Sequence, residues 1–290
     1  MLKWTGISVA TIVVLIIVAI IVIPHVVNTA AVKHKIEQVA QQKTGRQITI
    51  AGPLSLTLFP WVGFDAHDVT MANATGFGAK PFMHMKEAEL HAKLIPLIFG
   101  HVEISGITFD TPTINLARNK NGTSNWQDLV GGKHAAANEP AQKNGAPLAN
   151  LSVGRIAIED ATLDYDDAAS GKHYAIEQFD LNASDLAPGK SFPLTLSMQL
   201  ASTAPHLNTK LKLDTQAQFD KTAKEISLSK GTLGATLSGF GGNEPITLAA
   251  NWNRIALDEN AGTASIAGLV LALSDLKANL DANVKNLNEK

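Results

Sequence analysis

Several short motifs in this sequence contain residue types that perform catalysis or bind phosphate in other proteins. Gly189-Lys190-Ser191 ends like a phosphate-binding loop, but Ser184 stands where that loop needs its first glycine. Ser227-Leu228-Ser229-Lys230 has the Ser-x-x-Lys spacing of an acyl-transfer nucleophile, yet the sequence contains no Ser-Asp-Asn partner motif. Because neither motif has the context that its chemistry needs, we expect no catalytic residue and no enzymatic activity.

Histidines and acidic residues also occur in patterns that can bind metal ions. His101-Val102-Glu103 has the form His-x-Glu, but the zinc deaminases that share it need cysteine ligands, and this chain has no cysteine. His84 and Glu87 lack a third ligand nearby in the sequence. Asp164, Asp166 and Asp167 lack the glycine and the terminal glutamate of a calcium-binding EF-hand loop, so we interpret them as a solvated turn. The sequence therefore predicts no metal site and no cofactor.

Composition narrows the functional classes further. The chain has 290 residues, enough for one large domain or two ordinary ones, and 45% of them are hydrophobic. Its formal net charge of −2 indicates no polyanion partner, so we expect no binding to nucleic acid. The absence of cysteine excludes disulfides, thiolate catalysis and cysteine-ligated metal centres.

The N-terminal residues 1–27 are predicted to form a transmembrane anchor. No charged residue occurs from Ile7 to Val27, and a helix over that range spans about 31 Å, close to the hydrocarbon core of a bilayer. The anchor residues that we single out are Trp4, at an interfacial position, and the apolar Ile7, Val14, Ile17 and Ile23. A cleaved signal peptide is the alternative, but its apolar region would be shorter. A short N-terminus before a long polar body predicts that the body is translocated across the membrane.

After the anchor, the sequence predicts a short helix and then a mainly β region. Val32, Ile36 and Val39 recur at helical spacing, and Gly45 is typical of a helix C-terminus. Beyond Gly45 the apolar residues alternate with polar ones, which is the pattern of antiparallel strands with one covered face, and we expect about fourteen strands. The clearest apolar positions of this pattern are Leu54, Leu56, Leu58, Leu194, Leu196, Met198, Leu200, Leu276, Leu280 and Val284.

The β region is divided by a predicted linker at residues 131–150, which is rich in Gly, Ala, Asn, Lys and Pro and has no periodicity. Residues 28–130 precede it and residues 151–290 follow it. A repeat lies on its two sides, in residues 102–122 and 153–171, and aligns Ile107 with Ile156 and Gly122 with Gly171. We interpret the repeated unit as a β-hairpin used twice, which favours an elongated sheet.

Three further motifs, taken with the anchor, resemble the AsmA family of Gram-negative bacteria. They are the strand segment 52–64 (GPLSLTLFPWVGF), the stretch 94–100 (LIPLIFG) and the turn 121–126 (NGTSNW). The resemblance covers residues 1 to about 130, and beyond 150 only the general β pattern is similar. Family members are usually much longer. The alternation at 276–284 still runs close to the end of this chain, which is consistent with a piece of a longer protein.

The resemblance implies an inner-membrane protein with a periplasmic body that takes part in outer-membrane biogenesis. Such proteins are similar to bridge-like lipid-transfer proteins, with a chorein-like start and a long β-groove that carries phospholipids. The alternating apolar residues are then the candidates for the lining of the groove, and the expected partners are membrane phospholipids and other envelope proteins. The alternation alone is equally compatible with a closed β-sandwich, in which the body is an envelope scaffold.

Overall fold

The computed structural model describes residues 29–101, 103–130, 152–203, 206–239, 244–274 and 276–286. The predicted anchor at 1–27 and the predicted linker at 131–150 lie outside these residues. Among the helices that are described, none has the length and apolar character needed to cross a membrane.

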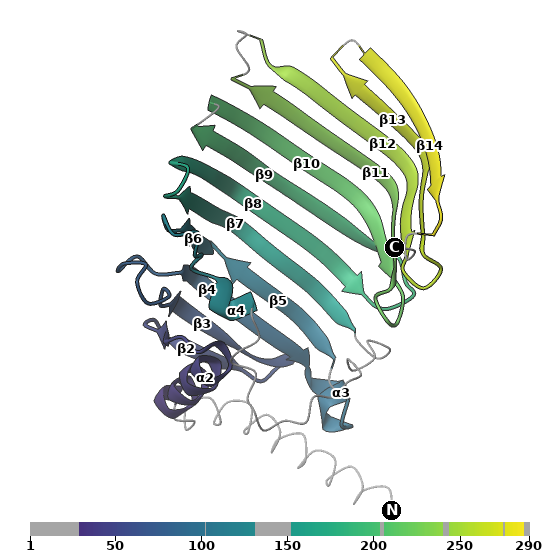
Figure 1. Ribbon diagram of the computed structural model, residues 1–290. Coiled ribbons are helices and arrows are strands. Elements are labelled where there is room, and N and C mark those ends of the chain that lie inside the picture. Colours follow the sequence, from purple (N-terminus) through teal and green to yellow (C-terminus); the bar gives the residue numbers. More distant parts are fainter. Residues whose placement is uncertain are drawn as a thin grey trace, which may run out of the picture.

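The described residues form a mainly β structure with three helices, as the sequence predicts (Figure 1). The helices are α2 (Thr29–Thr44), α3 (Leu94–Ile98) and α4 (Gln127–Val130). The first strands are β1 (Ile48–Ile50), β2 (Leu54–Thr57), β3 (Trp61–Met71), β4 (Met83–Lys93), β5 (Ile104–Asp110), β6 (Thr113–Arg118) and β7 (Val153–Asp167). They are followed by β8 (Lys172–Leu186), β9 (Phe192–Thr203), β10 (His206–Phe219), β11 (Glu225–Ser238), β12 (Ile246–Asp258), β13 (Thr263–Leu273) and β14 (Leu276–Val284).

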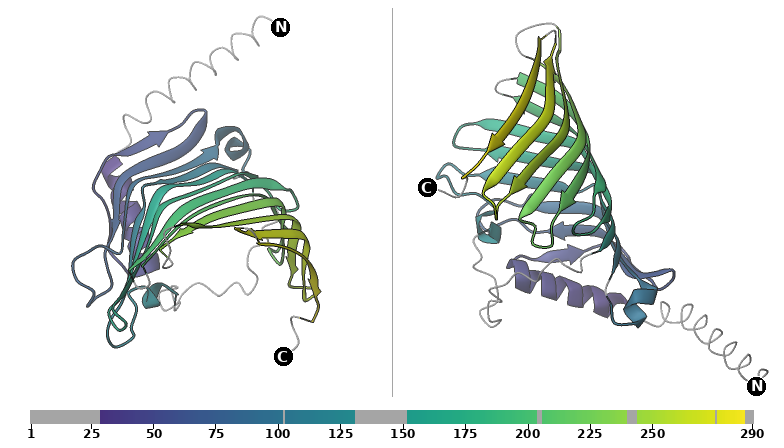
Figure 2. Two further views of the ribbon diagram at one scale, coloured as in Figure 1. Left: turned by 90° about the horizontal axis from the view of Figure 1, so that it is seen from above. Right: turned by 90° about the vertical axis from the view of Figure 1, so that its right-hand side faces the viewer.

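All fourteen described strands belong to one sheet, in which strands that follow one another along the chain are mostly neighbours. From β7 to β14 each strand pairs antiparallel with the next. The sheet is arched, so that it has a concave and a convex face (Figure 2). A closed sandwich needs a second sheet on the concave face, and the described residues supply none.

The sheet departs from the predicted antiparallel arrangement at one place. Strand β7 pairs parallel with β5 and with β6, because the chain passes through α4 and residues 131–152 between β6 and β7 and re-enters the sheet in the same direction. A parallel neighbour requires such a long connection, whereas a tight turn would have made β7 antiparallel.

The same junction corrects the interpretation of the repeat. The two copies are not two hairpins, because they lie side by side in the sheet and pair with each other. Ile107 lies opposite Ile156, as the repeat aligns them. Thr111, between β5 and β6, and Asp160, within β7, have positive φ angles of 50° and 51° at equivalent positions of the two copies. Each copy therefore runs in one direction through the same kink, as the two strands β5 and β6 in the first copy and as the single strand β7 in the second.

Further kinks of this kind interrupt other strands. Asp68 in β3, Gln178 in β8 and Lys230 in β11 have φ angles of 52°, 49° and 52°, and the β8–β9 and β10–β11 registers shift near the last two of these residues. An inserted residue of this type bends its strand and increases the local twist. The bulges at Gln178 and Lys230 therefore bend their strands in the arched sheet.

Helix α2 covers the concave face at the start of the sheet. Val32 and Ile36 pack on a cluster of buried side chains that includes Leu54 and Ala66. The helix ends as predicted at Gly45, whose φ is 73° and whose N–H donates to the Gln41 carbonyl at 2.8 Å. At this end of the sheet the alternating strands thus form an ordinary hydrophobic core.

Candidate functional site

A continuous row of apolar residues crosses the concave face from β2 to β14. Residues paired in register point to the same side of a sheet, so a row can be traced through the pairs one strand at a time. The row contains one residue from each of β2–β5 and β7–β14, and every one of them is apolar. Its members, in the order of the strands, are Leu54, Ala66, Ala88, Phe109, Ile158, Leu181, Leu196, Leu213, Leu233, Ala250, Leu271 and Ala278.

The sequence neighbours of this apolar row form a second row on the convex face, and that row is polar except at two positions. Its members are Ser55, Asp65, Glu89, Thr108, Ala157, Asn182, Thr195, Asp214, Thr232, Asn251, Val270 and Asn279. In these two rows the convex face of the sheet is thus mainly polar and the concave face is apolar.

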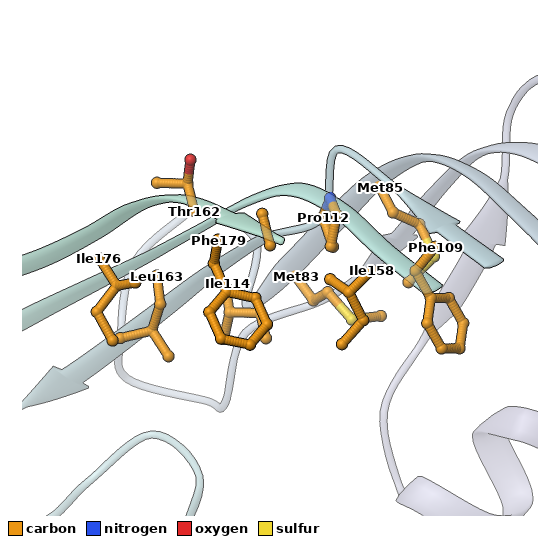
Figure 3. Close-up of a pocket in the computed structure, with 11 residues that line it drawn as sticks. Met83, Met85, Phe109, Pro112, Ile114, Ile158, Thr162, Leu163, Ile176 and Phe179 are labelled. Carbon is orange, nitrogen blue, oxygen red and sulfur yellow. The ribbon is translucent and has the colours of Figure 1, made fainter. Parts of the chain in front are cut away.

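The concave face is hollowed between β4 and β8, where an apolar pocket of about 330 Å³ opens. This volume is within the usual range of small-molecule pockets, about 300–1,000 Å³. The lining residues are Met83, Met85, Phe109, Pro112, Ile114, Ile158, Ala161, Thr162, Leu163, Ile176 and Phe179. Figure 3 shows the apolar side chains on one side of the strands, with the hydroxyl of Thr162 directed away from them. The pocket therefore offers apolar contact and no group that would recognise a polar ligand.

Most of the predicted groove residues lie on this concave face. Leu54 and Leu196 belong to the apolar row itself. The others are held in register with apolar partners on neighbouring strands: Leu56 with Phe64, Leu194 with Ala183, Met198 with Leu211, Leu200 with Ile176, Leu276 with Leu273, Leu280 with Leu269 and Val284 with Ala264. Leu58 is the exception, because β2 ends at Thr57 and Leu58 lies beyond it.

Sequence reasoning missed most of the residues of the pocket as candidates for the lining of a groove. Ile176 and Phe179 both line the pocket, yet they are three positions apart, because the bulge at Gln178 moves the alternation by one residue. The same effect separates Ile158 from Ala161 around Asp160. Within one strand, a shift of the apolar–polar alternation by one residue was the sequence signal that could have identified these pocket residues.

The turn 121–126, one of the motifs that resemble the AsmA family, has a structural role near the C-terminal end of α2. The Asn125 side chain is fully buried, donates to the carbonyl of Asn115 at 2.7 Å and accepts from the N–H of Ala117 at 2.9 Å. The guanidinium of Arg46 donates to the carbonyl of Asn125 and to both carboxylate oxygens of Asp128. Because Arg46 lies between α2 and β1, this network fastens the end of α2 to α4.

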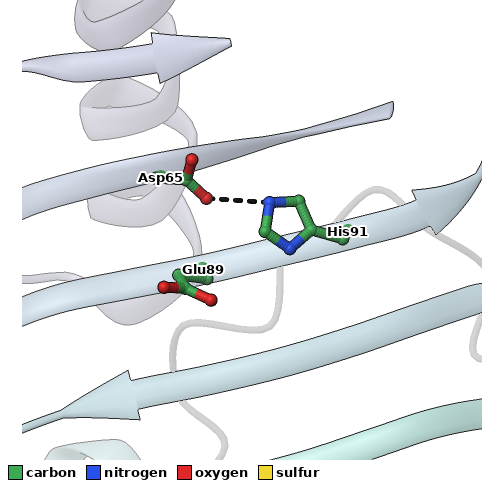
Figure 4. A group of neighbouring side chains, drawn as sticks. All are labelled: Asp65, Glu89 and His91. Atoms are coloured by element: carbon green, nitrogen blue, oxygen red, sulfur yellow. Dashed lines mark ion pairs between the residues drawn. The ribbon is translucent and has the colours of Figure 1, made fainter. Parts of the chain in front are cut away.

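The convex face carries a cluster that could hold a divalent cation. Asp65, Glu89 and His91 lie on adjacent strands, and their ligand atoms all lie within 4.8 Å of one another (Figure 4). Nε2 of His91 is 2.8 Å from Oδ1 of Asp65, so an ion pair already explains the approach of two of the three groups. Carboxylate and imidazole ligands suit several divalent metals. The sequence-based expectation that there is no metal stays a prediction.

One of the acidic residues with possible metal-binding chemistry, Asp167, is explained by local structure. The carboxylate of Asp167 accepts from the N–H of Ala169 at 3.0 Å and from the hydroxyl of Ser170 at 2.8 Å. The Ser170 hydroxyl is the main reason that the pKa of this carboxyl is lowered. Asp167, the last residue of β7, therefore stabilises the turn that follows it. Asp164 and Asp166 lie within β7, paired with Ala175 and His173, so the prediction of a solvated turn is wrong for these two residues.

Comparison with known proteins gives one match. The model of the AsmA family matches residues 1–290, and so extends beyond the segment in which the sequence motifs were found. No curated protein and no solved structure matches the chain.

Proposed function

This chain belongs to the AsmA family, and from that membership and its concave apolar face we propose that it carries phospholipid acyl chains along the face. The proposed setting is the periplasm of a Gram-negative bacterium. There the body would be held at the inner membrane by residues 1–27 and would serve outer-membrane biogenesis. AsmA-family proteins are envelope-associated, which is consistent with this setting.

The observation that carries the proposal is the continuity of the apolar row from β2 to β14. Eleven strand-to-strand steps of about 4.8 Å make the row roughly 50 Å long, more than the thickness of a bilayer hydrocarbon core, about 30 Å. A diacyl lipid with about 28 methylenes would cost roughly 20 kcal/mol to expose to water, at about 0.8 kcal/mol for each methylene. A lipid leaving a membrane therefore needs an apolar track without interruption, and the row has no polar member.

The proposed activity requires no catalytic group and no cofactor. Acyl chains are recognised by apolar area, so the lining of the pocket between β4 and β8, which is apolar apart from Thr162, suits this ligand. The proposed partners are membrane phospholipids, together with other envelope proteins, and nucleic acid is not among them.

Site-specific photo-crosslinking in cells tests the proposal. A photoreactive residue is placed at Leu196 or Ile158 of the apolar row, with matched controls at their exposed sequence neighbours Thr195 and Glu159. We expect phospholipid adducts at 196 and 158 and none at 195 and 159. Protein adducts without lipid adducts at 196 and 158 would contradict lipid transport and favour an envelope scaffold.

A further inference from the structure

A group of exposed apolar side chains lies at one corner of the sheet, away from the concave apolar row. We call it the corner patch and define it as Phe59, Trp61, Ile95, Leu97, Ile98 and Phe99. Ile95 and Ile98 are each 69% exposed. A contiguous exposed apolar patch usually marks a surface that another apolar phase covers.

The fold brings the two halves of the corner patch together. Trp61, the first residue of β3, pairs in register with Lys93, the last residue of β4, and α3 begins at the next position. The segment 59–61 and the helix α3 therefore leave the sheet at the same edge. The indole of Trp61 also contacts the ring of His91 at 5.8 Å between centroids, which fixes its place beside β4.

The base of the α3 loop is fastened, so its apolar residues are held outward. The N–H of Lys93 donates to the carbonyl of Glu103 at 2.8 Å, and the side chains of the same two residues form an ion pair at 3.1 Å. The N–H of His101 donates to the carbonyl of Pro96 at 2.9 Å and closes the turn after α3. A loop tied in this way presents Ile95 and Ile98 to the surroundings.

The position of α2 indicates what covers the corner patch. Helix α2 begins at Thr29, two residues after the charge-free run 7–27. The ammonium group of Lys33 donates to the carbonyl of Gly52 at 2.9 Å, and Val32 packs on the buried cluster that includes Leu54 at the start of β2. The first turns of α2 therefore lie along the segment that leads through β2 to Phe59, whereas the far end of α2 is fastened to α4. The chain enters the sheet from the side that carries the corner patch.

We propose that the corner patch docks into the surface of the phospholipid bilayer in which residues 7–27 are anchored. Aromatic rings such as those of Phe59, Trp61 and Phe99 suit the boundary between head groups and acyl chains, and the ammonium group of Lys93 lies at the base of the loop. The inference rests on the proposed function and adds to it, because docking at this corner sets the start of the concave face against the membrane that supplies the lipid.

Photo-crosslinking of the full-length chain in its native membrane tests the docking. The photoreactive residue is placed at Ile95 or Ile98, with Val130 as the control. Val130 is also apolar and is 79% exposed, but it lies on α4, beside the other end of α2. We expect phospholipid adducts at 95 and 98 and only background at 130. Protein adducts at 95 and 98, or no adducts there, would overturn the proposal.

A second variant distinguishes docking from accidental contact. Ile95→Ser combined with Ile98→Ser changes two exposed side chains, so folding should be preserved, and the phospholipid adduct formed at position 61 should fall several-fold. An unchanged adduct yield would count against the patch. Adducts at 95 and 98 without adducts at 196 would support membrane docking of the corner patch and contradict lipid transport along the concave face. Adducts at 196 without adducts at 95 and 98 would contradict the docking of the corner patch alone.

Discussion

The two ends of the concave face are built from the same alternating pattern but differ in what covers them. At the start, Leu54 in β2 is 7% exposed because α2 lies over it. At the other end, Leu276 in β14 is 72% exposed, and Leu280 and Val284 are also exposed. Alternation thus fixes which side chains share a face, while the presence or absence of a covering element decides whether that face becomes a core or an open surface.

In the middle of the concave face, some side chains are buried by their neighbours on adjacent strands rather than by a helix. Phe192 in β9 and Phe219 in β10 meet edge to face at 5.9 Å between ring centroids and bury Ala183 and Ala217 between neighbouring strands. Side chains there shield one another laterally, and no second layer from the described part of the chain lies above them. This packing gives the sheet local stability and leaves the rest of the concave face accessible.

The largest expected effect comes from placing a charge at each end of the apolar row. Leu54→Asp puts a carboxylate without a partner under α2, and we expect a loss of several kcal/mol in the free energy of unfolding. Leu196→Asp changes the same row where none of the described helices or strands lies above it, so water can solvate the charge and the cost should stay within about 1 kcal/mol. Chemical denaturation monitored by circular dichroism measures both values.

The two variants serve as controls for each other, because they introduce the same charge into the same row. Equal and large destabilisation would mean that Leu196 is enclosed in the folded protein, which would remove the open groove. Equal and small destabilisation would mean that α2 does not seal the start of the face.

A smaller loss in the free energy of unfolding is expected when the ion pair that fastens α2 to α4 is removed. The guanidinium of Arg46 holds the pKa of the Asp128 carboxyl below its usual value, although the Asp128 side chain is 35% exposed. Asp128→Asn should therefore cost about 1–2 kcal/mol at pH 7, after allowance for solvent screening. Because the folded pKa is the lower one, the contribution is complete above the unfolded pKa of about 3.9 and is lost as pH falls through the folded value.

Thermal unfolding of the wild type and of Asp128→Asn across pH 7 to pH 2 measures this contribution. The difference in melting temperature should be constant near neutral pH and should shrink at acidic pH. A difference that persists unchanged at pH 2 would show that the carboxylate charge is not responsible.

Much of the fold followed from sequence periodicity, because each half-solvated strand must alternate. Alternation identified Leu194, Leu196 and Leu200 as one face, and helical spacing together with Gly45 identified α2 and its end. The AsmA resemblance also held, and the family match covers the whole chain. These features are local, so the sequence expresses them directly.

The features that were not predicted depend on contacts between distant segments. The parallel pairing of β7 with β5 depends on the route taken between residues 118 and 153, which local pattern does not encode. The inclusion of Leu58 in the strand pattern ignored Pro60, which cannot donate to a ladder and follows shortly after the end of β2. The corner patch was missed as well, because a short apolar stretch such as 94–100 looks the same in a buried strand and in an exposed loop.

The smallest expected effect concerns a carboxylate that stabilises only its own turn. Asp220, between β10 and β11, accepts hydrogen bonds from the backbone N–H groups of Lys224 at 2.8 Å and Glu225 at 3.0 Å. The hydrogen bond from the backbone of Glu225 is the main reason that the pKa of this carboxyl is lowered to about 2. Unlike the ion pair of Asp128, these bonds join no separate elements, so their loss should open the turn and leave the rest of the sheet folded.

Nuclear magnetic resonance can follow this turn by itself. The carboxyl signal of Asp220 should titrate near pH 2, and the amide protons of Lys224 and Glu225 should remain protected at pH 3 and lose protection as pH falls through about 2. Since the folded pKa is the lower one, the turn is fully stabilised above the unfolded value of about 3.9 and is weakened only in strong acid. Asp220→Asn should abolish the pH dependence of these amides and leave the melting temperature nearly unchanged. A titration near pH 3.8, or a fall in melting temperature as large as that of Asp128→Asn, would mean that the open end of the sheet depends on its turns as much as the covered end depends on its ion pair.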